Sequence, residues 1–401
     1  MNNRERTLAI LSYKEYDRMP IVDFGFIWQP LEKWHEQGHI TLDELNDFGD
    51  GSPGCVSIEH KLGFDFNWQG CFNPGIKTGL MPPFERRVIE IFPDGREHIV
   101  THNGTIEGIK PGIHCIPQDI GTLLTDRTAW EEQFLPKLQF SQKRIEDLIN
   151  LMNTRGRFSC VKIHNTREPS PCVPREPSPC VPELYENPRG LHCGSLYGSI
   201  RNMMGVAHLA YLQADDEDLY HEIIDVIGDL SYQTVKAALG TGINFDFAHF
   251  WEDICFKNGP LVNPTVFKER VGPHYKKITD LLHKHGIQFV SLDCDGLIDH
   301  LVPTWLENGV NVMFPLEVGT WGANIHDLRK KFGKGLLAVG GMDKRLFTAP
   351  DGYKAIDMEV DRLRRLVDLG GYIPCPDHRI PDGAIWENIQ YYCERMKEVF
   401  W

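Results

Sequence analysis

From residue 191 to the end of the chain, short apolar runs alternate with longer amphipathic segments. Segments such as 263–286 and 351–371 have the spacing of helices with one buried face. Glycines at 286, 309 and 370–371 stand just before the next apolar run, where a helix ends. The predicted strands are 191–195, 243–250, 287–292, 310–316, 336–341 and 371–374. This alternation predicts a parallel sheet with crossover helices.

The N-terminal half adds further elements. Residues 3–18 predict a helix, 19–26 a first strand, and a second strand is expected near 64 or 160. The count approaches eight, which favours a closed (β/α)8 TIM-type barrel over an open doubly wound sheet. No GxGxxG follows a strand, so a dinucleotide site is disfavoured. We therefore predict an α/β fold with one barrel domain over residues 1–401.

Two segments depart from this pattern. Residues 84–108 alternate apolar and polar side chains around Pro93-Asp94-Gly95, which predicts a small antiparallel β-hairpin insertion.

Residues 166–182 contain the octapeptide REPSPCVP twice in tandem. The many prolines exclude a helix or a central strand. The repeat is either a stiff arm that docks a partner or, as we favour, a duplicated surface loop.

Composition narrows the class of protein. The formal net charge is −14 and no Lys/Arg cluster stands out, so a nucleic-acid partner is not expected. No apolar stretch approaches the roughly 18 residues of a membrane span. The N-terminus has no signal-peptide pattern, and eleven cysteines without a CxxC pair are typical of reduced thiols. These features predict a cytoplasmic protein that acts on small molecules.

Acidic and histidine side chains collect where the predicted strands end. They are His249, Glu252 and Asp253, then Asp293 and Asp295, then Glu317, then Asp343, and finally Asp377 and His378. Each acid alone is also explained as a helix cap. A parallel barrel, however, places all strand ends around one opening, the usual place of an active site. Confined carboxylates raise one another's pKa, which provides a proton donor near neutral pH. We predict Asp293, Asp295, Glu317 and His378 as catalytic.

Aromatic side chains are frequent at the same strand ends. Most will belong to the core, but tryptophans just past a strand indicate an apolar or aromatic substrate, or a methylammonium cation. With the neighbouring polar groups, the predicted substrate-binding residues are Phe26, Trp28, Tyr197, His249, Trp251 and Glu252.

Several segments resemble the uroporphyrinogen decarboxylase superfamily. They are NRERTLAILSYKEYDRMPI (3–21), GSLYGSIRNMMG (194–205), WEDICFKNGPLVNP (251–264), DCDGLIDHLVPTWLENGVNVMFPLE (293–317), GGMDKR (340–345) and GGYIPCPDHRIPDGAIWENIQYY (370–392). The resemblance implies a (β/α)8 barrel and either a decarboxylase or a cobalamin-dependent methyltransferase. The decarboxylases have an arginine-rich segment near the N-terminus, whereas this chain reads VDFGFIWQPLEKW there. The resemblance therefore points to the methyltransferase branch.

In that branch, His-x-Cys-Gly and a later cysteine bind zinc. The matching positions here are Asp293-x-Asp295-Gly296 and His378, so any metal would be bound by Asp293, Asp295 and His378. The resemblance implies transfer of a methyl group to cob(I)alamin on a partner corrinoid protein, and the acidic and aromatic side chains at the strand ends favour a methoxylated aromatic compound as the methyl donor. Other interpretations are a methylamine methyltransferase, a uroporphyrinogen decarboxylase and a tetrapyrrole-binding barrel without catalysis. A homodimer is compatible with the sequence.

Overall fold

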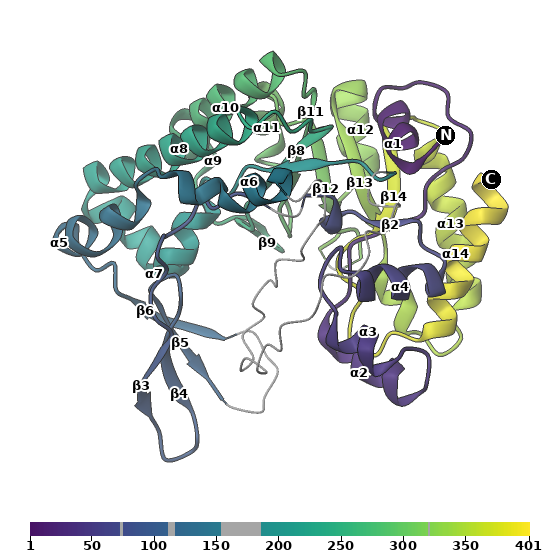
Figure 1. Ribbon diagram of the computed structural model, residues 1–401, viewed down its shortest axis with the longest axis horizontal. Coiled ribbons are helices and arrows are strands. Elements are labelled where there is room, and N and C mark those ends of the chain that lie inside the picture. The colour runs from purple at the N-terminus through teal and green to yellow at the C-terminus, as the bar shows by residue number, and fades with distance from the viewer. Residues whose placement is uncertain (73–74, 111–116, 154–185, 320) are drawn as a thin grey trace.

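The computed structural model describes residues 1–72, 75–110, 117–153, 186–319 and 321–401. Its centre is a six-stranded parallel sheet of order β14-β13-β12-β11-β8-β7 (Figure 1). The strands are β7 (Gly190–His192), β8 (Phe247–Trp251), β11 (Phe289–Asp293), β12 (Val312–Leu316), β13 (Leu337–Met342) and β14 (Tyr372–Pro376). Each lies within or overlaps a strand predicted from the alternating pattern. The predicted parallel α/β architecture is therefore confirmed.

Two further strands are short. β1 (Val22–Asp23) and β2 (Phe66–Asn67) pair in parallel as a separate two-stranded sheet. An isolated bridge between Phe26 and Ile380 connects the segment after β1 with the segment after β14. Among the described residues, no strand pairing joins β2 to β7. The strand near 64 is thus present, but a barrel closed by hydrogen bonds, as the sequence predicted, is not shown.

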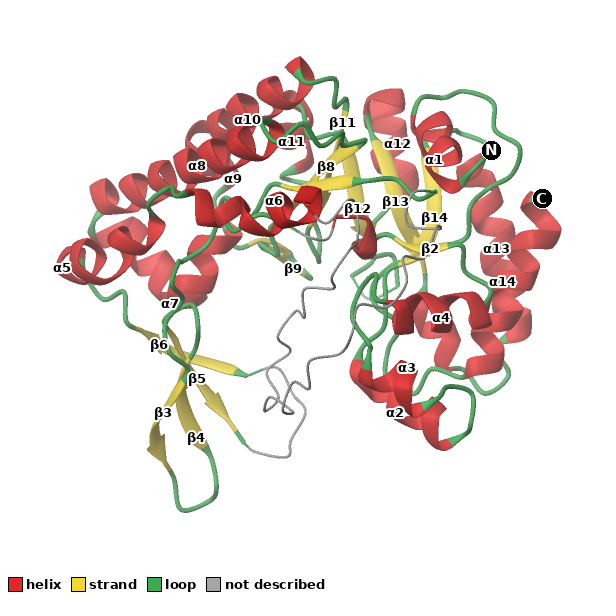
Figure 2. Cartoon of the chain, in the orientation of Figure 1, coloured by secondary structure: helices red, strands yellow, loops and turns green. Residues whose placement is uncertain are grey.

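Helices surround the sheet, as Figure 2 shows. One group, α7, α8 and α10, packs together: α8 contacts both α7 and α10. A second group lies beside the chain ends, where α13 packs on α14. The helices are α1 (Asn3–Leu11), α2 (Trp28–Glu36), α3 (Leu42–Asn46), α4 (Pro53–Leu62), α5 (Arg127–Ala129), α6 (Glu146–Asn153), α7 (Gly198–Asp215), α8 (Glu217–Leu239), α9 (Pro264–Val266), α10 (Gly272–Lys284), α11 (Val302–Glu307), α12 (Ile325–Phe332), α13 (Tyr353–Val367) and α14 (Trp386–Phe400).

The predicted helices differ from the observed ones in two places. The helix expected over 3–18 ends at Leu11, because Tyr13 adopts a left-handed backbone with φ of 56°. The helix expected over 263–286 is divided into α9, a π-helical turn η6 (Phe267–Val271) and α10. Pro273 has no N–H to donate to the preceding turn, and a π-helical turn accommodates that loss.

The antiparallel insertion is larger than expected. The predicted hairpin is formed by β3 (Arg87–Ile91) and β4 (Glu97–Val100), joined by a turn in which Gly95 has φ of 81°. Two more strands, β5 (Thr105–Ile109) and β6 (Gln118–Thr122), extend the sheet to residue 122. The predicted range of 84–108 was therefore too short. The REPSPCVP repeat lies outside the described residues.

The interior has two apolar clusters. The larger one lies between the sheet and the helices. The smaller one joins residues of β1 and β2 to Phe247, Phe314 and Val339 of the central sheet. Since successive strand residues point to opposite sides, β8, β11, β12, β13 and β14 each contribute side chains to both clusters, whereas β7 contributes only Leu191 to the larger one. Burial on both sides explains why most positions of these strands are apolar.

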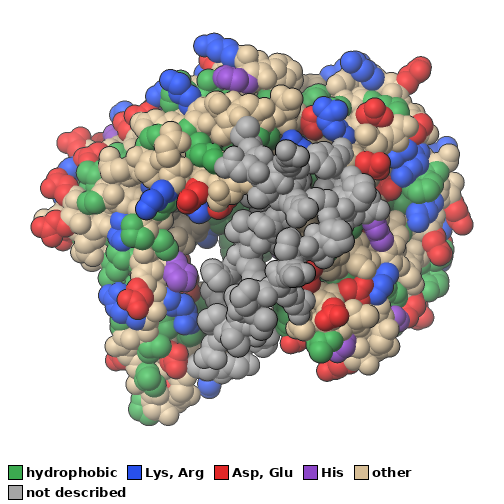
Figure 3. Space-filling model, viewed as in Figure 1, with side chains coloured by type: hydrophobic (Ala, Val, Ile, Leu, Met, Phe, Trp, Pro, Cys, Tyr) green, Lys and Arg blue, Asp and Glu red, His purple; other side chains and the backbone are tan. Residues whose placement is uncertain are grey.

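The surface carries charges of both signs. On the face drawn in Figure 3, Lys and Arg side chains are interspersed with Asp and Glu rather than gathered in one area. Within the described part of the chain, no helix has both the length and the apolar composition that crossing a membrane requires.

Candidate active site

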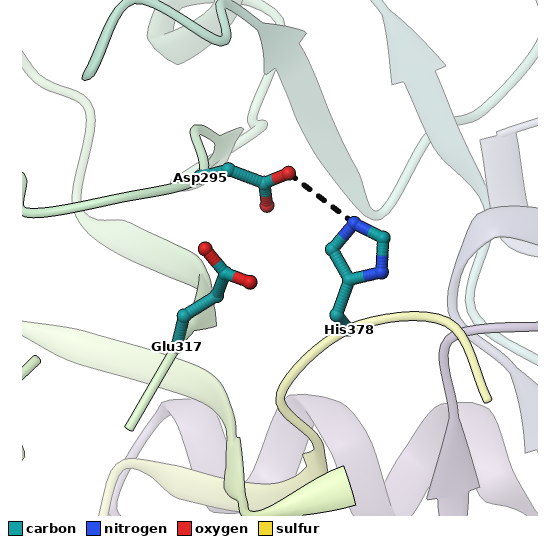
Figure 4. Close-up of side chains that lie close together, drawn as sticks. All are labelled: Asp295, Glu317 and His378. Carbon is teal, nitrogen blue, oxygen red and sulfur yellow. Dashed lines mark ion pairs between the residues drawn. The ribbon is translucent and has the colours of Figure 1, made fainter. Parts of the chain in front are cut away.

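Three of the predicted catalytic side chains meet at the carboxyl ends of the strands. The histidine Nε2 of His378, after β14, lies 3.2 Å from a carboxylate oxygen of Asp295, after β11. Glu317 follows β12, and its carboxylate faces the same space (Figure 4). One ligand atom from each of these three residues lies within 4.8 Å of the others. The parallel sheet therefore brings together side chains that are up to 83 positions apart (295 and 378).

Asp293 belongs to an overlapping second group. Carboxylate oxygens of Asp253, Asp293 and Asp295 lie within 4.8 Å of one another. Asp293 is the last residue of β11, and its side chain accepts a hydrogen bond of 3.3 Å from Gln69. The ligand set predicted from sequence, Asp293, Asp295 and His378, is thus not a single group in the structure. Glu317 takes the place of Asp293 beside the histidine, because β12 ends next to the loop that carries Asp295.

Asp253, an acid at a predicted strand end but outside the predicted catalytic set, belongs to the site. Its backbone has φ of 51°, in the left-handed region that non-glycine residues rarely adopt. One of its carboxylate oxygens accepts a 3.3 Å hydrogen bond from the backbone N–H of Asp295. Strained backbone of this kind persists where surrounding contacts hold it, and it is frequent at functional sites. In the sequence, the position of Asp253 directly after Trp251 and Glu252, at the end of a predicted strand, was the one feature that indicated a place in the site.

Burial and mutual repulsion raise the pKa values of these acids. Burial and the charge of Asp295 raise the pKa of Glu317 to about 7 and that of Asp253 to about 6. The same two causes raise the pKa of Asp293 well above its ordinary value. The site therefore has carboxyl groups that hold a proton close to neutral pH, which is what a general acid requires.

Backbone and basic groups hold this arrangement. Glu317 accepts a 2.9 Å hydrogen bond from the N–H of Gly296, and the Lys344 ammonium lies 3.5 Å away. Gly296 has φ of 90°, and a Cβ there would lie 2.9 Å from the backbone of Cys255. Only glycine fits between the loop of Asp295 and the segment after β8. Asp377 is engaged elsewhere, since it accepts from the backbone N–H groups of Gly319 and Lys344.

Arg379, the residue after His378, was not predicted. Its guanidinium makes two hydrogen bonds with the carboxylate of Asp50, at 3.0 and 2.7 Å. Its charge also acts on Asp293 and lowers the pKa of that acid against the larger effect of burial. Arg379 belongs to the sequence CPDHR, but nothing near it in the sequence indicated that it pairs with the distant Asp50.

The predicted substrate-binding residues have different surroundings. Tyr197 is buried and its hydroxyl bonds that of Tyr220 at 2.8 Å. Glu252 is buried and accepts hydrogen bonds from three consecutive backbone N–H groups, those of Leu196, Tyr197 and Gly198. These contacts place Glu252 at the N-terminus of α7 as an anchor of that helix. Glu252 and Tyr197 thus both make hydrogen bonds within the protein, and their predicted contact with substrate stays a prediction.

His249 lies in the interior, beneath the acids. Its ring stacks on Phe72 with a centroid distance of 4.0 Å, and Nδ1 shares a 2.7 Å hydrogen bond with the Ser291 hydroxyl. Nε2 is buried and has no hydrogen-bond partner among the described residues. Burial lowers the pKa of His249 well below its ordinary value, so the ring is neutral.

The aromatic residues of the predicted substrate site are divided. Phe26 is buried in the core, where it packs edge-on against Trp34. Trp28, the first residue of α2, and Trp251, the last residue of β8, are each partly exposed. Only the two tryptophans thus keep surface that a bound molecule could contact.

Comparison with known proteins gives a structural likeness. No protein-family description and no curated protein matches this sequence. Among solved structures, a methyltransferase from Methanosarcina mazei aligns over 99% of both chains with a TM-score of 0.56 and 12% identity. A B12-independent methionine synthase from Shewanella sp. W3-18-1 aligns over 95% of this chain and 96% of its own, with a TM-score of 0.45 and 10% identity. At such identities the first comparison shows a shared fold alone, that of a protein described as a methyltransferase.

Proposed function

We propose that this protein is a methyltransferase that demethylates a methoxylated aromatic compound and passes the methyl group to cob(I)alamin on a partner corrinoid protein. The observation that carries the proposal is the group of Asp293, Asp295, Glu317 and His378 at the strand ends, with Asp253 beside it. The fold shared with a methyltransferase agrees with it.

The chemistry explains why acids are needed. When the methyl–oxygen bond breaks, its electron pair stays on the oxygen, and the methyl group goes to the nucleophile. The oxygen leaves more readily if it takes up a proton, so a protonated carboxyl nearby lowers the barrier. Glu317, whose pKa is about 7, can hold that proton. His378 lies next to Asp295 and can orient the Asp295 carboxylate or return a proton to it.

A divalent metal ion fits the same place. Asp295, Glu317 and His378 supply two carboxylates and an imidazole, a set that binds zinc and similar ions. One oxygen of Asp295 is buried without a hydrogen-bond partner among the described residues, as a ligand atom would be. A bound ion would supply a Lewis acid for the ether oxygen. Metal content measured together with activity decides between this role and direct protonation.

The test is methyl transfer from a panel of donors to free cob(I)alamin, followed by its absorbance spectrum. We expect transfer from methoxylated aromatics and little from methylamines. Preference for a methylamine would favour the alternative that this protein is a methylamine methyltransferase. Decarboxylation of a porphyrinogen, or corrinoid binding without any transfer, would contradict the proposal and favour a decarboxylase or a tetrapyrrole-binding barrel.

A further inference from the structure

Arg201 is a cation at the edge of the acidic site whose guanidinium has no hydrogen-bond partner among the described residues. It lies in the first turn of α7, where its backbone N–H donates to Tyr197. Its side chain makes no hydrogen bond to any described residue, and its Nε is buried without a partner. The nearest acid is Asp253, at 3.7 Å from one guanidinium nitrogen, which is too long for a hydrogen bond. A guanidinium has five N–H donors, so this one is far from satisfied.

The end of β8 and the two residues after it lie against this arginine and α7. Three consecutive residues contact α7 or its side chains. The ring of Trp251 lies 5.8 Å from the guanidinium carbon, Glu252 binds the N-terminus of α7, and Asp253 faces the arginine itself. The side chain of Arg201 is 24% exposed, so part of it reaches solvent. Arg201 is therefore held beside Trp251 and Asp253, and within the described part of the chain no hydrogen bond occupies the exposed part of its guanidinium.

We propose that Arg201 binds a carboxylate of the substrate, so that the methyl donor is a methoxylated aromatic acid. This inference rests on the proposed function. The planar guanidinium matches a carboxylate through two parallel hydrogen bonds. Trp251 offers a ring face beside it, suited to the aromatic ring of the same molecule. The carboxylate would thus be held at α7, and the methoxy group would point toward the acids after β11 and β12.

Neighbouring acids do not prevent such binding. Asp253 is the acid nearest to Arg201, and it approaches only one guanidinium nitrogen, at 3.7 Å. The loose contact of Asp253 with Arg201 leaves the remaining guanidinium edge for the substrate.

The test compares 4-methoxybenzoate with its uncharged counterpart 4-methoxybenzamide in methyl transfer to cob(I)alamin. The wild type should favour the carboxylate in kcat/KM. Arg201→Met should reduce this preference by about 10- to 100-fold, mainly through KM, because charged hydrogen bonds are lost. Arg201→Lys should retain part of it, since the charge stays while the planar fork is lost. Arg365→Met, an exposed arginine on α13, removes the same charge and should leave the preference unchanged.

Binding of benzoate and benzamide, measured by calorimetry, gives a readout that does not depend on turnover. If the wild type binds benzoate more tightly than benzamide and this difference disappears in Arg201→Met, the carboxylate site is supported. Absence of methyl transfer from every donor would then reject the proposed function but not the carboxylate site. Equal binding of both compounds to the wild type, or equal loss of both in the variant, would overturn the carboxylate site. Should Arg201→Met fail to fold in a thermal melt, Arg201→Lys and the wild-type preference still decide.

Discussion

Glu252 and Glu317 occupy similar positions and have opposite surroundings. Both are almost fully buried and both directly follow a strand of the central sheet. Glu252 accepts hydrogen bonds from three backbone N–H groups and from the hydroxyls of Ser195 and Tyr275. Glu317 accepts one backbone hydrogen bond and faces another acid, Asp295. Burial raises the pKa of both acids, but the hydrogen-bond donors around Glu252 oppose that rise and make it a structural anchor, whereas the charge of Asp295 adds to the rise at Glu317.

The largest effect is expected from Glu252→Ala. The substitution leaves three buried backbone N–H groups without their acceptor, and each unsatisfied group costs about 1–3 kcal/mol. We expect a loss of roughly 4 kcal/mol in the free energy of unfolding, measured by urea titration. A loss below about 1 kcal/mol would show that Glu252 does not anchor α7.

Asp293→Asn should act on chemistry and spare the fold. Asp293 accepts one side-chain hydrogen bond, from Gln69, and an amide oxygen can still accept it. Methyl transfer should fall about 100-fold, the usual scale of an acid–base group. The melting temperature should stay within a few degrees of the wild type. An unfolded variant, or one with full activity, would contradict the catalytic role of Asp293.

His378→Ala should reduce methyl transfer about tenfold, because Asp295 loses the partner that orients it. Elemental analysis of wild type and variant checks the metal role. If a divalent ion is bound, it should be absent from the variant, and dialysis against a chelator should lower wild-type activity in step. Full activity of metal-free wild-type protein would leave direct protonation as the mechanism. His35→Ala, a histidine distant in sequence from these strand ends, is the control.

Glu317→Gln should have a small effect on stability that depends on pH. The folded-state pKa of Glu317 is raised from 4.5 to about 7, so the wild type loses stability as pH rises through this interval. The amide has no charge to bury and still accepts from Gly296. At pH 8 we expect the variant to melt about 2 °C higher than the wild type. At pH 4 the difference should vanish, and a constant difference across pH would disprove the linkage.

Much of the fold was determined by the sequence alone. The alternation of apolar runs and amphipathic segments predicted the six central strands and their parallel order, since that periodicity follows directly from the burial of each face. The turn at Pro93-Asp94-Gly95 was equally local, because glycine adopts positive φ without steric cost. The positions of the acids at the strand ends could also be predicted from the sequence, because each acid directly follows an apolar run.

The tertiary structure decided which of these acids meet. Sequence spacing places a side chain at the end of a strand, but its neighbours depend on register and on the path of loops from other strands. Glu317 therefore replaces Asp293 beside His378, and Asp253 joins the site through an unusual backbone conformation. Glu252 and Arg201 show the same point. The placement of α7 against the end of β8 decides which donors bind Glu252 and leaves Arg201 without a hydrogen-bond acceptor among the described residues, and no local pattern encodes that placement.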